Sequence, residues 1–225
     1  MRSIVPVVLV RLTESFAAHG DPERGALMAA YMRNQFDFAG IGSPERRRLA
    51  KEALAGLRAP TEREVGALAR KCWAKPEREF QLFATDVVLP RAKHCSPDFL
   101  ATLRFLVTHK SWWDTVDRLA QAVGQLVLAH PELAADMDEW IDDDDFWVAR
   151  VAIIHQLGFR ARTDTDRLFG YCARRARDDE FFIRKAIGWA LRQYARTDAA
   201  AVRAFVAAHP ELSGLSRREA LRWIG

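Results

Sequence analysis

Apolar residues recur with a period close to 3.6 along almost the whole of this 225-residue chain, and no stretch alternates as a β-strand would. Short polar segments interrupt the pattern, such as GDPERG from Gly20, APTERE from Ala59 and ARTDTD from Ala161. Many of them place Ser, Thr or Asp at a helix N-cap, or Pro in a first turn followed by an acidic residue. The sequence therefore predicts an all-α protein of about eleven to thirteen helices.

Four segments share one layout, in which polar residues precede one or two aromatic residues and an apolar helix. They are REFQLFATDVVL from Arg78, KSWWDTVDRLA from Lys110, DDFWVARVAII from Asp144 and DEFFIRKAIGW from Asp179. If Phe80, Trp112, Phe146 and Phe181 are equivalent, the unit recurs after 32, 34 and 35 residues. Helix pairs of this length stack into an α-solenoid, which presents equivalent positions of successive units on one concave face. A compact irregular bundle is the alternative.

Charge is distributed unevenly along the chain. Residues 146–225 contain 15 Lys and Arg against 8 Asp and Glu, whereas residues 1–145 contain 19 against 22. A basic half of this kind suits a polyanionic partner, although solvated helix faces often carry the same excess. Cys72, Cys95 and Cys172 match neither a disulfide framework nor a zinc spacing, which favours a reducing compartment.

The N-terminal segment MRSIVPVVLVRL is apolar but short. Pro6 and Arg11 interrupt it and no small-residue cleavage site follows, so it predicts an amphipathic helix rather than a membrane span or a signal peptide. We therefore expect a cytoplasmic protein with no membrane partner. A chain of 225 residues does not require two domains, and we expect a single repeat domain over residues 1–225.

The segment THKSWWDTVDRLAQAVGQ, residues 108–125, places two indoles and two carboxylates at the start of one predicted helix. Ser111 lies where an N-cap belongs, and Asp114 follows it at the spacing of a capping box. Pairing of Asp114 with Arg118, four residues later, is the alternative. Either arrangement gives Asp114 a structural role.

Asp117 follows Trp113 by four residues, so the two side chains project from the same helix face. Trp112 lies on the neighbouring apolar face, and we expect it to pack in the core. A carboxylate alone at this position is most often a solvated surface group. The next two repeats change that interpretation, because they add charged and aromatic residues at comparable positions.

Arg150 is the one charged residue in the apolar stretch 146–154. A buried guanidinium requires an anionic partner, and a carboxylate on the adjacent repeat is the natural candidate, with one of residues 142–145 as the alternative. One repeat later, Gly188 leaves space beside Trp189. A carboxylate, a guanidinium and two indoles predict a site for a cationic ligand, since indole faces attract cations by roughly 0.5–2 kcal/mol.

The chain closely resembles the AlkD-like DNA alkylation repair glycosylases in three strings: YMRNQFDFAGIGSPERRRLAKEAL from Tyr31, KSWWDTVDRLA from Lys110 and FFIRKAIGWALRQYARTD from Phe181. The resemblance runs in order from about residue 27 to the C-terminal LSRREALRWIG. It implies a HEAT-like α-solenoid whose concave, basic groove holds duplex DNA. Members hydrolyse the N-glycosidic bond of cationic N3- and N7-alkylpurines, such as 3-methyladenine and 7-methylguanine, without a base pocket.

The resemblance also implies roles for five residues. Asp117 is expected to be the catalytic aspartate, which stabilises an oxocarbenium ion and orients the attacking water. Arg150 is expected to bind a phosphate or to hold Asp117, and Trp113 and Trp189 to pack against the sugar–phosphate backbone. Tyr31 is expected near the lesion. No lysine occupies an obvious nucleophile position, so we expect a monofunctional glycosylase without lyase activity.

Contacts to the DNA backbone are expected from basic residues, since the chain contains 28 Arg and 6 Lys. The candidates are Arg46, Arg47, Arg48, Arg184, Lys185, Arg192, Arg217 and Arg218. The histidines show no ligand spacing, so we expect neither a metal nor a cofactor. We expect a monomer that binds duplex DNA containing alkylated purines. The alternatives are a non-catalytic helical-repeat DNA scaffold and a protein–protein adaptor.

Overall fold

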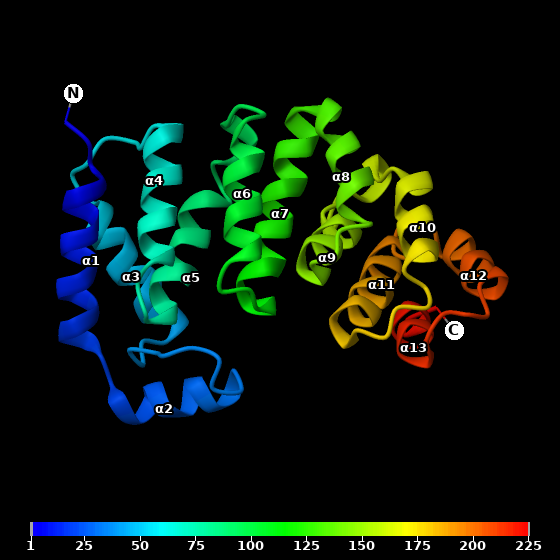
Figure 1. Cartoon of the computed structure of the whole chain (residues 1–225), viewed down its shortest axis with the longest axis horizontal. Coiled ribbons are helices and arrows are strands. Elements are labelled where there is room, and N and C mark those ends of the chain that lie inside the picture. The colour runs from blue at the N-terminus through cyan, green and yellow to red at the C-terminus, as the bar shows by residue number, and fades with distance from the viewer. Residues whose placement is uncertain (1, 225) are drawn as a thin grey trace. The chain divides into compact units, whose positions relative to one another are not determined.

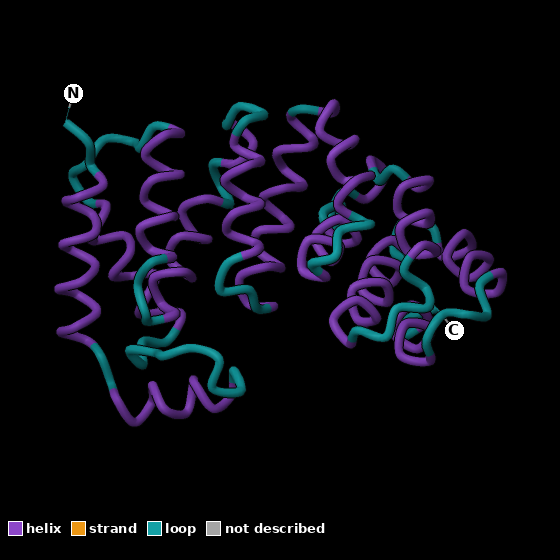
Figure 2. Tube along the Cα trace, in the orientation of Figure 1, coloured by secondary structure: helices purple, strands orange, loops and turns teal. Residues whose placement is uncertain are grey.

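The computed structural model describes residues 2–224. Thirteen α-helices and three short 3₁₀-helices form the regular structure of this range, which contains no β-strand (Figure 1, Figure 2). The all-α prediction and the predicted number of helices are therefore confirmed. The helices belong to two compact units, one ending at Arg91 and the other beginning at Ala92, which we describe separately.

The first unit contains five α-helices. They are α1 (Val5–His19), α2 (Pro22–Tyr31), α3 (Ser43–Leu54), α4 (Glu62–Trp73) and α5 (Arg78–Val88). Helices α1 and α5 each pack against both α3 and α4. Helix α1 is the amphipathic helix predicted for the N-terminal segment, and it buries Val5, Val8, Leu12 and Phe16.

Side-chain caps determine where helices of the first unit begin. Thr61 and Glu64 form a capping box at α4, in which the Glu64 carboxylate accepts from the Thr61 N–H at 3.0 Å. The same carboxylate accepts from the Ile4 N–H at 3.1 Å and pairs with Arg58 at 2.7 Å, which ties α4 to the start of α1. Asp21 caps α2. The polar segments of the sequence thus mark these two helix starts.

A buried carboxylate fixes the loop between α2 and α3. Glu79, fully buried near the start of α5, accepts hydrogen bonds from the backbone N–H groups of residues 39–41 at 3.0–3.1 Å. Three donors offset much of the desolvation of a buried charge. Helix α2 itself buries only Gly25, where the missing Cβ allows close approach to the carbonyl oxygen of Phe38 in this loop.

The second unit contains the other eight α-helices. They are α6 (Phe99–Thr108), α7 (Trp113–Ala129), α8 (Ala134–Trp140), α9 (Phe146–Ile154), α10 (Thr165–Arg174), α11 (Phe181–Tyr194), α12 (Ala199–Ala208) and α13 (Gly214–Leu221). The 3₁₀-helices are η1 (Ala92–His94), η2 (Pro131–Leu133) and η3 (Arg160–Arg162).

Alternate helices of the second unit form one layer. Helices α7, α9, α11 and α13 begin at residues 113, 146, 181 and 214, so successive starts are 33, 35 and 33 residues apart. Each packs against the next, while α6, α8, α10 and α12 pack against the layer helix that follows them (Figure 1). Serial stacking of helix pairs is the architecture of a helical repeat rather than of an irregular bundle.

Two glycines set how closely the layer helices approach one another. A Cβ at Gly124 of α7 would lie 2.0 Å from the carbonyl oxygen of His155, which follows α9. A Cβ at Gly188 of α11 would lie 2.4 Å from Cβ of Glu219 on α13. The prediction that Gly188 leaves space beside Trp189 is therefore wrong, because α13 occupies that space.

Candidate active site

Asp117 and Arg150 form a bidentate ion pair between adjacent layer helices. Nε and Nη2 of Arg150 donate to Oδ1 and Oδ2 of Asp117 at 2.8 and 3.0 Å. Asp117 lies in the second turn of α7, and Arg150 lies in the part of α9, residues 147–154, in which every side chain is buried. The prediction that Arg150 pairs with a carboxylate of the neighbouring repeat is therefore confirmed.

The acidic residues that precede α9 have other partners. Asp145 caps α9 by accepting from the N–H of Trp147 at 2.9 Å. Asp143 accepts from Arg104 at 2.6 Å. The alternative pairing of Arg150 with this acidic run is therefore wrong.

Burial is the main influence on the ionisation of Asp117. The side chains of Arg150 and Asp117 are 5% and 17% exposed. Burial raises the pKa of Asp117, and the Arg150 guanidinium opposes that rise. Arg150 also donates from Nη1 to the carbonyl oxygen of Phe182, and its guanidinium carbon lies 5.8 Å from the centre of the Phe182 ring. The guanidinium is thus held from both α7 and α11.

Asp117 and Arg150 line a cavity of about 330 Å³. Side chains from α7, α9, α11 and α13 form its walls, namely Trp113, Asp117, Arg150, Phe181, Phe182, Lys185, Trp189, Arg192 and Glu219. The structure thus brings together the carboxylate, the guanidinium and the two indoles that the sequence singles out. A carboxylate with little water around it, close to two indole rings, can stabilise positive charge more strongly than a surface carboxylate can.

Trp112 is not part of the cavity wall. It packs against Trp147 and Phe182, with ring centres 5.9 and 5.3 Å apart, in agreement with the packing role predicted for it. Trp112 is also the N-cap residue of α7, so the predicted capping box of Ser111 and Asp114 is wrong. The Ser111 hydroxyl instead donates to a carbonyl oxygen of α6 at 2.5 Å.

The sequence matches the model of a family described as DNA alkylation repair enzyme over residues 12–224. The chain belongs to this family. The resemblance seen in the sequence strings, which start at Tyr31, Lys110 and Phe181, is therefore confirmed at the level of the family.

Solved structures agree with the assignment to the DNA alkylation repair enzymes. A structure titled "Predicted DNA alkylation repair enzyme from Enterococcus faecalis" is similar over 92% of this chain and 97% of that chain, with 33% identity and a TM-score of 0.85. AlkD2 from Streptococcus mutans is similar over 81% and 90%, with 17% identity and a TM-score of 0.63. At that identity the likeness shows a shared helical-repeat fold. No curated protein matches the chain.

Glu219 is the charged cavity residue of this family member that the sequence did not reveal; Phe181 and Phe182 also line the cavity without having been predicted as site residues. The Glu219 carboxylate, on α13, accepts from Nζ of Lys185 at 2.9 Å and also pairs with Arg192. The hydrogen bond from Lys185 lowers the pKa of Glu219. In the sequence, Glu219 lies within SRREALRW, a charged segment typical of a solvated helix. Only the packing of α13 on α11 places it in the cavity.

The basic residues predicted as phosphate contacts in the second unit have several environments. Lys185 and Arg192 line the cavity. Arg184 and Arg217 each donate to a nearby backbone carbonyl oxygen, at 2.8 and 3.2 Å. Arg218 is exposed. Lys185, which sequence reasoning placed only among the phosphate contacts, therefore lies in the same cavity as Asp117.

The predicted residues of the first unit are also distributed between surface and interior. Arg46 is buried and pairs with Asp86, so it is not a phosphate contact. Arg47 and Arg48 are exposed, and Arg48 pairs with two glutamates of its own helix. Tyr31 is exposed at the end of α2.

The described residues were also compared with the requirements of a membrane span and of a metal site. No helix within residues 2–224 is long and apolar enough to span a membrane. In the same range, no group of three or more His, Cys, Asp or Glu side chains is arranged to hold a metal ion.

Proposed function

We propose that this DNA alkylation repair enzyme is a glycosylase that hydrolyses the N-glycosidic bond of cationic N3- and N7-alkylpurines in duplex DNA. The observation that carries the proposal is the Asp117 carboxylate, which is desolvated, fixed by Arg150 and accompanied by Trp113 and Trp189 in one cavity. An alkylated purine already carries positive charge and is a good leaving group. The reaction therefore needs stabilisation of a sugar cation more than it needs a strong general acid.

The chemistry follows from the charge of this carboxylate. As the glycosidic bond breaks, the cationic purine takes the bonding electrons and leaves as a neutral base, and positive charge develops on the deoxyribose. Asp117 stabilises that charge in surroundings where water screens it little. Arg150 uses one acceptor site on each Asp117 oxygen, so each keeps a lone pair for the attacking water. The raised pKa of Asp117 favours uptake of a proton from that water.

The other cavity residues bind the DNA around the lesion. Trp113 and Trp189 pack against the sugar–phosphate backbone and attract the cationic centre through their ring faces. Lys185 and Arg192 contact phosphates. Outside the cavity, Tyr31 of the first unit is proposed as a further DNA contact. Exposed arginines outside the cavity add backbone contacts, so affinity falls steeply with salt.

Lys185 does not act as a nucleophile in this proposal. Its ammonium group donates to Glu219 at 2.9 Å, and an ammonium in an ion pair has no lone pair with which to attack a sugar carbon. The enzyme is therefore monofunctional and leaves the DNA strand intact at the abasic site. We further propose that it acts in the cytoplasm as a monomer without a cofactor.

A non-catalytic DNA scaffold is the second candidate, because Lys185 and Arg192 would bind a polyanion in either case. The presence of Asp117 in the cavity distinguishes the catalytic function from the scaffold function. A desolvated carboxylate repels phosphates, so a protein that only held DNA would gain affinity by losing it. Its place in the cavity supports catalysis.

The proposal is tested by incubating the wild-type protein with methylated duplex DNA and quantifying free 7-methylguanine and 3-methyladenine by mass spectrometry. We expect release of both bases, unbroken strands and no borohydride-trapped protein–DNA adduct. Tight DNA binding without released base would contradict the glycosylase proposal and support the non-catalytic scaffold. Strand cleavage with a trapped adduct would contradict the monofunctional mechanism.

A further inference from the structure

Lys185, Trp189 and Arg192 form one stripe along α11. Their spacing of four and three residues places them on a single helix face, and all three line the cavity that contains Asp117. The two cations are seven residues apart, which corresponds to about 10 Å along the helix axis. Side chains as long and flexible as these would not converge without a common partner.

One carboxylate joins the two cations. Oε1 of Glu219 accepts from Nζ of Lys185 at 2.9 Å, and Oε2 accepts from Nη1 of Arg192. Both cations are therefore drawn toward the middle of the stripe. Their side chains are 37% and 22% exposed, and each keeps N–H donors that Glu219 does not use. A second anion can thus bind both cations while Glu219 still holds them.

The position of Glu219 is fixed by backbone packing. The absence of a Cβ at Gly188 lets α13 approach so closely that an added Cβ would lie 3.0 Å from the carbonyl oxygen of Ser216. The Ser216 hydroxyl donates to the carbonyl oxygen of Arg184 at 2.9 Å, which fastens α13 to α11 beside the stripe. Glu219 is one turn further along α13, and it is 16% exposed.

We propose that Glu219 is a positioning residue, which holds Lys185 and Arg192 as a two-point clamp for the phosphate backbone of DNA beside Asp117. The inference rests on the DNA-directed function proposed above, but it concerns backbone binding and not base release. A carboxylate in this position also repels phosphates. The two effects have opposite signs, so removal of the charge distinguishes them.

Positioning outweighs repulsion for a physical reason. Immobilising a long side chain on binding has an entropic penalty, and an ion pair formed beforehand removes that penalty for both cations. Repulsion between Glu219 and a phosphate is screened by salt at the open side of the cavity. We therefore expect Glu219→Gln, which keeps the size of the side chain, to weaken binding to duplex DNA by about 5- to 10-fold.

The test measures binding of the full chain to undamaged duplex DNA over a range of salt concentrations. Four proteins are compared: the wild type, Glu219→Gln, the double variant Lys185→Ala/Arg192→Ala and the triple variant. Loss of two phosphate contacts should make the logarithmic salt slope of the double variant shallower by about 2. Glu219→Gln should also lower the affinity and make the salt slope shallower. The triple variant should bind DNA no more weakly than the double variant, because without those cations Glu219 contributes only repulsion of phosphates.

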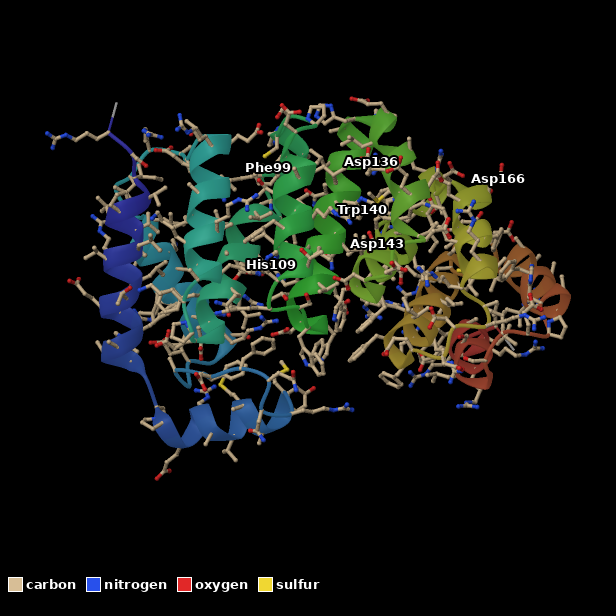
Figure 3. The ribbon with its side chains drawn as sticks, viewed as in Figure 1. Phe99, His109, Asp136, Trp140, Asp143 and Asp166 are labelled. Atoms are coloured by element: carbon tan, nitrogen blue, oxygen red, sulfur yellow. The ribbon has the colours of Figure 1, made fainter. Side chains whose placement is uncertain are left out.

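Asp143→Asn is the matched control. Asp143 lies between α8 and α9, close to Trp140 (Figure 3). Its carboxylate pairs with Arg104. It resembles Glu219 in charge and exposure, at 20%, but does not line the cavity. Removing this negative charge should leave DNA affinity unchanged or slightly higher. Thermal unfolding of each variant checks that the proteins remain folded.

Tighter DNA binding by Glu219→Gln would overturn the inference, because it would show that repulsion dominates. A triple variant weaker than the double variant would also overturn it, since Glu219 would then act by another route. If the expected binding pattern is found but no base is released, the clamp is supported and the glycosylase proposal is refuted. If base is released but Glu219→Gln has the salt slope of the wild type, the glycosylase proposal is supported and the clamp is refuted.

Discussion

At the scale of single residues, Asp117 combines burial with a bidentate cationic partner. Burial hinders its ionisation and Arg150 favours it, and burial has the larger effect on the pKa. A surface aspartate would be ionised but screened by water, and a buried aspartate without a partner would be neutral. The pair with Arg150 therefore supplies a negative charge where screening is weak, as stabilisation of a sugar cation requires.

The pH dependence of base release follows from the same residue. Because the pKa of Asp117 is raised, its carboxylate becomes protonated, as the pH falls, at a higher pH than an exposed aspartate does. We expect the single-turnover rate of 7-methylguanine release to decline in that region, after subtraction of spontaneous release. A rate that stays constant down to the ordinary aspartate range would contradict the role of Asp117.

His155 is predicted to make the folded protein sensitive to acid. Its buried ring donates from Nδ1 to the carbonyl oxygen of Ala152 at 2.7 Å, and burial lowers the pKa of His155 to about 4. The pKa of a histidine in an unfolded chain is about 6.5. Between these values the unfolded state binds a proton that the folded state excludes. The free energy of unfolding should therefore fall as the pH falls through this window, by up to about 3 kcal/mol.

Denaturant unfolding at several pH values checks this effect. The wild type is compared with His155→Gln, which carries no titratable ring. The variant should lose less of its unfolding free energy than the wild type across the window, whatever its stability at neutral pH. Equal slopes for the two proteins would show that His155 is not the source of the acid sensitivity.

At the scale of helices, two Gly→Ala substitutions are predicted to have opposite effects. A Cβ at Gly124 would lie 2.0 Å from the backbone oxygen of His155, so Gly124→Ala should destabilise the protein by roughly 1–3 kcal/mol. Gly170, in α10, has nothing within 4 Å of an added Cβ, so Gly170→Ala should stabilise it by up to about 1 kcal/mol. Urea unfolding measures both. A Gly124→Ala variant as stable as the wild type would contradict the close approach of α7 to the end of α9.

Helix starts were predictable where the signal is local. Asp145, Asp164 and Asp198 cap α9, α10 and α12 with their own side chains, and each belongs to a polar segment of the sequence. Helix α7 is different because tertiary packing decides its start. Trp112 adopts an extended backbone at the N-cap and packs against Trp147 of another helix, which no local pattern around residue 112 could indicate.

The candidate site was predictable to a similar extent. Arg150 is the one charge in an apolar run, so its need for a carboxylate on another repeat could be inferred before the partner was known. Glu219 could not be found in this way. Its two ion pairs join residues 34 and 27 positions apart, and they exist because Gly188 admits α13.

At the scale of the whole molecule, the 28 arginines of the chain occupy different environments, some buried in ion pairs and others exposed to solvent. Arg46 is buried with Asp86, whereas Arg47, the next residue, is exposed. Arg46→Ala should lower the free energy of unfolding by about 3–5 kcal/mol, because it breaks a largely buried ion pair with Asp86. Arg47→Ala should leave stability nearly unchanged and make the salt slope of DNA binding shallower by about 1. Denaturant unfolding and DNA-binding titrations of both variants test this prediction. Loss of stability in Arg47→Ala, or a shallower salt slope in Arg46→Ala with unchanged stability, would contradict it.

The most direct test of the central claim is the single-turnover rate of 7-methylguanine release by Asp117→Asn. Asp114→Asn is the matched control, since it removes the same charge one turn earlier on α7 without altering the cavity wall. We expect Asp117→Asn to lose at least about 100-fold in rate while remaining folded and bound to DNA. Asp114→Asn should stay close to the wild type. Release by Asp117→Asn at the wild-type rate would show that catalysis does not depend on this carboxylate.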